Sequence, residues 1–105
     1  MKRTLGIVTV GRSDYGIYAP VIRNILSHGD LELRVYVSGA HLDPKFGNTV
    51  DEVEKSGVFI AAKVSAGTLG NSPADTVEAM GRITQRFAQL FRSQGPDILL
   101  VVGDR

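Results

Sequence analysis

Apolar residues along the chain form four short runs of strand length, and segments with helical spacing separate them. The first run, from Leu5 to Val10, is rich in Val and Ile and stops abruptly at Gly11. A continuous apolar run of this length predicts a strand covered on both faces, as in a parallel sheet under helices. Residues 31–37 alternate between apolar and polar and then turn apolar, which predicts a second strand that is less covered at its start. Residues 58–64 predict a third, short strand, and residues 97–102 a fourth.

The segment after Gly11 has the apolar spacing of an amphipathic helix. Its apolar residues are Ile17, Val21, Ile22, Ile25 and Leu26, and they predict about three helical turns that end near Gly29. Proline is tolerated in the first turn of a helix, so Pro20 indicates a start between Asp14 and Ile17.

Two further helices are marked by their first residues. Thr49 and Glu52 have the spacing of a capping box, and Gly57 is a natural stop for the short helix that follows them. Ser72 and Pro73 predict the N-cap and first position of a longer helix. The apolar stripe of this longer helix comprises Val77, Met80, Ile83, Phe87, Leu90 and Phe91.

Strand and helix alternate throughout, which is the pattern of an α/β fold with a parallel sheet and crossover helices. The last predicted strand has five consecutive aliphatic residues, yet the sequence ends three residues after it. A sheet cut there would expose an unpaired apolar edge, which proteins normally avoid. We therefore expect residues 1–105 to form an incomplete N-terminal domain of a longer polypeptide. A partner that covers the edge is the alternative.

Composition narrows the class of protein. The 105 residues are 43% hydrophobic and 22% charged with a net charge of +1, and the basic residues are spread along the chain. A nucleic-acid or membrane partner would call for a basic cluster, so we expect neither. The chain has no apolar run of membrane-spanning length, no signal-peptide pattern and no cysteine, which together predict a cytoplasmic protein without disulfides.

Three loops follow predicted strands and meet at one rim of a parallel sheet: residues 11–16, 38–47 and 103–105. Ligands bind at this rim in open α/β sheets. Two arginines, Arg12 and Arg105, and a helix N-terminus suit a diphosphate, since guanidinium groups match phosphate geometry. Arg12 could equally be a solvated loop residue beside a helix cap.

Two other side chains at this rim are candidates for chemistry. Asp104 comes directly off a rigid strand and could hold a carboxylate against a substrate hydroxyl or a reacting proton, or could be a turn residue. His41 could be a ligand contact or a supporting residue. It does not form a metal motif with His28, so we predict no metal site. The sequence also lacks the G-x-G-x-x-G, P-loop and G-x-S-x-G motifs.

At these loops the sequence resembles the hydrolysing UDP-N-acetylglucosamine 2-epimerases, in the branch that feeds sialic acid and related nonulosonic acid synthesis. The matching pieces, in order and register, are residues 11–16 with Ala19 and Pro20, residues 38–42, residues 46–49 with Glu52, and residues 95–97 through 102–105. Other branches of the family have a lysine where this sequence has Ile17, which favours the sialic acid branch.

The resemblance implies two Rossmann-like domains that face each other in the GT-B arrangement, with a UDP-sugar bound between them and no cofactor. It also implies the reaction. UDP is eliminated across C1 and C2 of the sugar to give a glycal-like intermediate, and water then adds to give N-acetylmannosamine and free UDP. We further expect the full-length enzyme to be a homo-oligomer, either a dimer or a tetramer.

The resemblance also assigns roles to residues. Arg12 and the turn at Gly16 lie against the uridine diphosphate, and Arg105 reaches the same ligand. Asp104 is the catalytic acid/base or the carboxylate that orients the substrate. Asp14, in the first loop, and His41, on the sugar side of the cleft, complete the substrate-binding set.

Three alternatives stay open from the sequence. Within the family, the substrate could be a UDP-diacetamido-trideoxyhexose of the legionaminic acid route. Outside it, the chain could be the nucleotide-sugar half of a GT-B glycosyltransferase, which would need an acceptor for turnover. It could also be a non-catalytic flavodoxin-like binding module.

Overall fold

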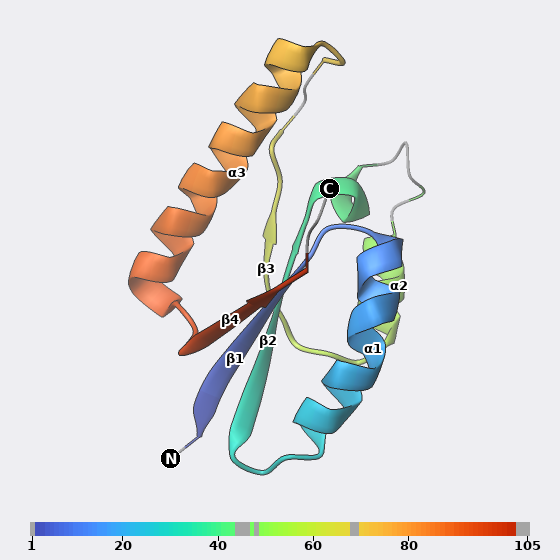
Figure 1. Cartoon of the computed structure of the whole chain (residues 1–105), viewed down its shortest axis with the longest axis vertical. Helices are drawn as coiled ribbons and strands as arrows, with labels where there is room; N and C mark the ends of the chain where they lie inside the picture. Colours follow the sequence, from blue (N-terminus) through green and yellow to red (C-terminus); the bar gives the residue numbers. More distant parts are fainter. Residues whose placement is uncertain (1, 44–46, 48, 68–69, 103–105) are drawn as a thin grey trace.

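The computed structural model describes residues 2–43, 47, 49–67 and 70–102 (Figure 1). Four parallel strands form one sheet in the order β3-β2-β1-β4. The strands are β1 (Arg3–Thr9), β2 (Leu31–Ser38), β3 (Ile60–Val64) and β4 (Ile98–Val101). The helices are α1 (Arg12–Leu26), α2 (Val50–Lys55), α3 (Pro73–Gln94) and the single 3₁₀ turn η1 (Gly39–Leu42). The predicted parallel α/β sheet is confirmed.

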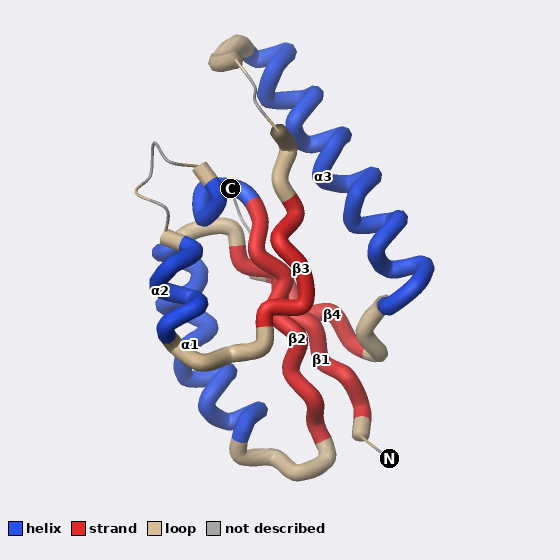
Figure 2. Tube along the Cα trace, turned by 180° about the vertical axis from the view of Figure 1, so that it is seen from behind, coloured by secondary structure: helices blue, strands red, loops and turns tan. Residues whose placement is uncertain are grey.

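The helices divide between the two faces of the sheet. α1 and α2 lie on one face and α3 lies on the other, as both views show (Figures 1 and 2). Because β1 is central, its side chains alternate between these layers. Ile7 points to the α1 face, whereas a Cβ on Gly6 would point toward Tyr36 on the α3 face.

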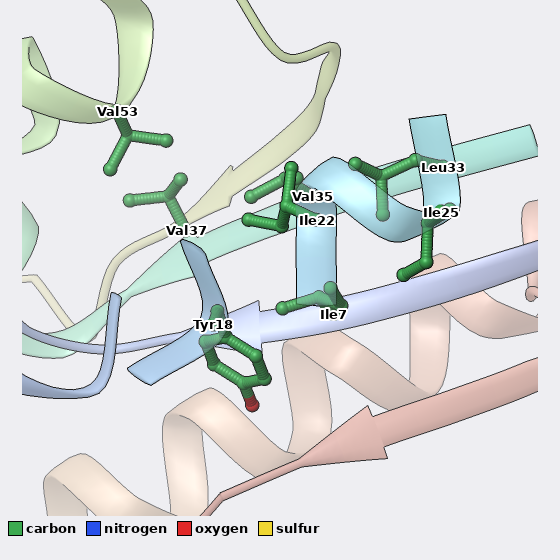
Figure 3. Packing of buried hydrophobic residues seen from close by; sticks show 8 residues of the cluster. All are labelled: Ile7, Tyr18, Ile22, Ile25, Leu33, Val35, Val37 and Val53. Carbon is green, nitrogen blue, oxygen red and sulfur yellow. The ribbon is translucent and has the colours of Figure 1, made fainter. Parts of the chain in front are cut away.

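The α1 face holds the buried core of the described chain (Figure 3). Its members come from β1, β2, α1 and α2, and all are at most 6% exposed: Ile7, Tyr18, Ile22, Ile25, Leu33, Val35, Val37 and Val53. The hydroxyl of Tyr18 donates to the carbonyl of Val8 at 2.9 Å, which satisfies its one polar group inside the core. Burial raises the pKa of Tyr18.

The predicted apolar stripe of α1 is only partly right. Ile22 and Ile25 are buried, but Ile17 and Leu26 are each 61% exposed. The stripe that packs on the sheet includes Tyr18 instead, one helical turn before Ile22. Aliphatic residues flank this stripe on both sides, so their spacing alone did not identify which of them face the core.

The predicted start of α1 is also wrong. The helix begins at Arg12, and Pro20 lies inside it rather than in its first turn. Proline there removes the hydrogen bond that its N–H would otherwise give to the carbonyl of Gly16, and the remaining bonds carry the helix through. The early start is explained by Asp14, which binds backbone N–H groups just before the helix.

The α3 face is built around one aromatic cluster. Tyr36 is buried, and its ring meets Phe87 at 6.1 Å and Phe91 at 5.3 Å between centroids, both edge-to-face. Among the described residues of α3 none is fully buried, and Val77 and Met80 are 67% and 63% exposed. The predicted cap of this helix is confirmed, because the hydroxyl of Ser72 accepts from Asp75 N at 3.1 Å.

Strand β4 is aligned on β1 by a clasp at its start. The carboxylate of Asp97 accepts from the backbone N–H of Thr4 at 2.8 Å and from its hydroxyl at 3.2 Å. These bonds lower the pKa of Asp97. The apolar run of β4 is not covered on both faces by the described residues: Val101 is 61% exposed and Leu99 is 42% exposed.

Candidate functional site

The turn from β1 into α1 is held by the carboxylate of Asp14. It accepts from the backbone N–H groups of Val10 at 3.0 Å and Gly11 at 3.2 Å, and from the hydroxyl of Thr9 at 2.6 Å. Gly11 is the N-cap residue and has no side chain with which to cap the helix. Asp14 therefore fixes the backbone that enters the helix, and Arg12 is the first residue of that helix.

A buried histidine connects this turn to two other segments. Nε2 of His41 lies 2.8 Å from the hydroxyl of Thr9, and Nδ1 lies 2.7 Å from the hydroxyl of Thr49. His41 is 1% exposed, Thr9 0% and Thr49 5%. His41 also donates its backbone N–H to the carbonyl of Val10 at 3.1 Å. One imidazole thus joins the end of β1, the turn η1 and the start of α2.

The partners of His41 assign its tautomer. Thr9 has one hydroxyl proton and gives it to the carboxylate of Asp14, which can only accept. Thr9 must then accept from His41, so Nε2 carries the proton. In a neutral ring Nδ1 is an acceptor, and Thr49 donates to it. The three hydrogen bonds therefore all point the same way: Thr49 donates to His41, His41 donates to Thr9, and Thr9 donates to Asp14.

The electrostatics agree with a neutral ring. Burial lowers the pKa of His41, because removal from water disfavours the charged imidazolium. The carboxylates of Asp14 and Glu52 act in the opposite sense, and the effect of burial is the larger.

Thr49 and Glu52 do not form the predicted capping box. The hydroxyl of Thr49 makes no capping bond to α2, because it is bonded to His41 instead. The carboxylate of Glu52 is bonded to Arg12, accepting from Nε at 3.1 Å and from Nη2 at 2.8 Å. Both side chains that have the spacing of a local cap are used in contacts to other segments.

The ion pair of Arg12 and Glu52 lies at the surface, with the two side chains 70% and 52% exposed. Beside it, Tyr15 bonds the hydroxyl of Ser56 at 2.6 Å, which ties α1 to the end of α2. The ring of Tyr15 also meets that of His41 edge-on, at 6.3 Å between centroids. Side chains from the first turn of α1 thus contact both ends of the short helix.

The structure brings together three of the predicted site residues. Arg12, Asp14 and His41 gather at the carboxyl ends of β1 and β2, where the sequence placed them. Asp14 and His41 belong to one hydrogen-bonded network, which runs from Thr49 through His41 and Thr9 to Asp14 and which we call the buried network. The side chain of Arg12 is exposed. Gly16 lies on α1 with nothing within 4 Å of the position a Cβ would take. The binding roles given to these residues stay predictions.

The predicted catalytic residue Asp104 and the predicted ligand contact Arg105 lie outside the described residues. Within the described part of the chain, His, Asp and Glu side chains form no group of three that could hold a metal ion. No helix in that part has the length and apolar character needed to cross a membrane.

Three residues in these contacts were not among the predicted site residues: Thr9, and also Thr49 and Glu52, whose spacing predicted only a helix cap. Thr9 carried a signal, because it is the one hydroxyl residue in the apolar run from Leu5 to Val10. A polar group buried in a strand requires a hydrogen-bond partner, so its presence points to another polar group nearby. No comparable feature of the sequence pointed to His41 as the partner of Thr49 or to Arg12 as the partner of Glu52.

The parallel sheet, with helices on both faces and strand order β3-β2-β1-β4, has the architecture of a Rossmann-like α/β domain. The model of the UDP-N-acetylglucosamine 2-epimerase family matches residues 23–105. The chain belongs to this family, which confirms at the level of the family the resemblance noted from the loop motifs.

Individual relatives agree with this membership. The chain is 31% identical over 105 residues to the UDP-N,N'-diacetylbacillosamine 2-epimerase (hydrolyzing) of Legionella pneumophila, covering 100% of this chain and 28% of the relative. It is 28% identical over 109 residues to the UDP-N-acetylglucosamine 2-epimerase of Neisseria meningitidis serogroup B, covering 100% of this chain and 27% of that protein.

A solved structure agrees with the fold. A crystal structure of a UDP-N-acetylglucosamine 2-epimerase superimposes with a TM-score of 0.74 at 19% identity. It covers 100% of this chain and 28% of that one. The chain therefore spans somewhat more than a quarter of the length of the proteins it matches.

Proposed function

We propose that the protein is a hydrolysing 2-epimerase that converts UDP-N-acetylglucosamine to N-acetylmannosamine and UDP. Membership of the epimerase family over residues 23–105 is the observation that carries the proposal. The relative from Neisseria meningitidis is named for the same sugar nucleotide. The described residues would supply one wall of the site, and a second Rossmann-like domain in the GT-B arrangement would supply the other.

The proposed reaction has two steps, an elimination of UDP followed by an addition of water. A base removes the proton on C2 while the C1–O bond breaks, and UDP leaves with the electron pair of that bond. Water then adds across the double bond of the glycal-like intermediate, with its hydroxyl on C1 and a proton on the opposite face of C2. The products are the 2-epimer of the free sugar and UDP, and no redox step or cofactor is needed.

Arg12 is the proposed diphosphate contact of this wall, together with Arg105 and with Gly16, which lies in the second turn of α1 and not in the predicted loop turn. The exposure of Arg12 and its place at the N-terminus of α1 support this, because helix N-termini and guanidinium groups both favour phosphate. Asp14 and His41 are proposed to serve the same site. Their bonds to each other through Thr9 favour a role in holding the loops that carry Arg12.

Asp104 is the proposed acid/base of this wall. The variant Asp104→Asn is nearly isosteric and should lower kcat of the full-length enzyme by roughly 100-fold or more, the usual effect of a general acid–base group. UDP affinity should change little, because the diphosphate contacts are assigned to the arginines. A variant with normal kcat and only a lowered melting temperature would make Asp104 a structural residue.

A second substrate deserves equal testing, because the relative from Legionella pneumophila is named for a diacetamido sugar nucleotide. The full-length protein should be incubated separately with UDP-N-acetylglucosamine and with UDP-N,N'-diacetylbacillosamine in D₂O, and the products identified by NMR. We expect free UDP and a free 2-epimeric sugar that carries deuterium at C2, without any acceptor. Retention of the nucleotide on the epimer would contradict hydrolysis, and turnover only with an acceptor would indicate a glycosyltransferase.

A further inference from the structure

The ion pair between Arg12 and Glu52 uses only one edge of the guanidinium group. The carboxylate accepts from Nε and Nη2, a side-on bidentate geometry. Arginine has five N–H donors in one plane, so two on Nη1 and one on Nη2 are left for other partners. Among the described residues, Arg12 donates to Glu52 alone, and its side chain is 70% exposed. Within the described part of the chain, the second edge of the fork is therefore left for a ligand.

The backbone next to each residue of this pair is fixed by the hydrogen-bonded chain of Thr49, His41, Thr9 and Asp14. Arg12 follows a turn whose N–H groups are bonded to Asp14. Glu52 lies one helical turn after Thr49, whose hydroxyl is bonded to His41. His41 and Asp14 are linked in turn through a single hydroxyl. These buried hydrogen bonds thus fix the distance between the starts of α1 and α2. The ion pair of Arg12 and Glu52 connects the same two helix starts at the surface.

We propose that Glu52 is a positioning residue for substrate binding. It holds Arg12 side-on so that the edge formed by Nη1 and Nη2 faces the diphosphate of the UDP-sugar. The inference rests on the proposed function, because that function supplies the anion. An arginine that is free in solution loses the freedom of several rotatable bonds when it binds. Here Glu52 removes that freedom beforehand, so the ligand does not have to order the side chain.

Repulsion between Glu52 and a diphosphate acts in the opposite sense, and it is the weaker effect. Both side chains of the pair are more than half exposed, so water and salt screen the repulsion. The two-edge geometry lets a carboxylate and a phosphate occupy Arg12 together, so neither has to displace the other. The same exposure means that the pair contributes little to folding, and loss of Glu52 should leave the protein folded.

The test is a double-mutant cycle on UDP affinity, measured by calorimetry in the full-length protein. We expect Glu52→Gln to weaken UDP binding by about two- to tenfold, the cost of ordering one flexible side chain, and Glu52→Ala to weaken it at least as much. In an Arg12→Ala background, Glu52→Gln should have no further effect, because there is no guanidinium left to position. Melting temperatures should stay close to that of the wild type.

Glu54→Gln is the matched control, because Glu54 lies on the same helix and makes an exposed ion pair with Lys63 instead. It should leave UDP affinity unchanged. Tighter or equal binding by Glu52→Gln, with Arg12→Ala still weakened, would overturn the positioning role and leave the proposed function intact. Equal binding by wild type and Arg12→Ala would overturn both the positioning role of Glu52 and the diphosphate contact proposed for Arg12, whereas the proposed reaction is tested separately by its products.

Discussion

The two faces of the sheet differ in how far the chain covers them. On the α1 face, eight side chains from four elements are at most 6% exposed, and the polar network continues this packing up to the carboxyl ends of the strands. On the α3 face, one aromatic cluster around Tyr36 holds a 22-residue helix of which no described residue is fully buried. Apolar spacing predicted that both helices exist, yet among the described residues only the α1 face forms a buried core and carries the candidate site.

The largest expected effect tests this difference in packing. Ile7→Ala should lower the free energy of unfolding by about 2–5 kcal/mol, because it leaves a cavity in the α1 face. Met80→Ala on α3 should change it by no more than about 0.5 kcal/mol, since Met80 is 63% exposed. Urea denaturation of both variants measures the contrast. Equal losses would mean that the α3 face packs as tightly as the α1 face.

The next effect concerns the site itself. Arg12→Ala should weaken UDP binding by about 1.5–3 kcal/mol, the range for a charge-assisted hydrogen bond, and Arg12→Lys should recover part of it. Arg82→Ala removes an exposed arginine from α3 and should leave the affinity unchanged. Calorimetry on the full-length protein distinguishes these variants. Equal affinities for all of them would return Arg12 to an ordinary surface residue.

A smaller expected effect tests whether any part of the α3 face is closely packed. A Cβ on Gly6 would lie 2.8 Å from both Tyr36 Cε2 and Pro96 Cγ, so Gly6→Ala should destabilise the protein by about 1–3 kcal/mol. Gly81→Ala, inside α3 with no atom within 4 Å of its Cβ position, should stabilise it by about 0.5–1 kcal/mol. Thermal unfolding checks the opposite signs. A neutral Gly6→Ala would show that Tyr36 is free to shift.

The smallest effect is on pH dependence. Burial lowers the pKa of His41 below its ordinary 6.5, so below that pH the folded state binds fewer protons than the unfolded state. The free energy of unfolding should therefore fall as the pH drops through and below 6.5, while Asp14 and Glu52 limit the fall. Urea denaturation from about pH 8 to pH 5 should show this slope in the wild type and a flatter one in His41→Gln. An equal slope in the wild type and in His41→Gln would mean that the pKa of His41 is the same in the folded and unfolded states.

Sequence patterns predicted those features of the structure that depend on residues close together in the sequence. The strand predicted over Leu5–Val10 and the cap at Ser72 both depend on residues close in sequence; the cap agrees with the structure, and the strand is present but spans Arg3–Thr9. The pairing of Thr49 with His41 and of Glu52 with Arg12 could not be found in this way. These partners are 8 and 40 residues apart, and the capping-box spacing at Thr49 suggested a nearer use for the same side chains.

The clasp between Thr4 and Asp97 has a consequence for how the protein is made. β1 receives its second neighbour, β4, only after 93 further residues have been synthesised. At about 5–20 residues per second, the ribosome takes roughly 5–20 s to supply that neighbour. β1, α1 and β2 can assemble early, because their contacts are close along the chain. Throughout this interval one edge of the central strand stays unpaired in the nascent protein, and it is there that an elongating chain would be most exposed to chaperones or to aggregation.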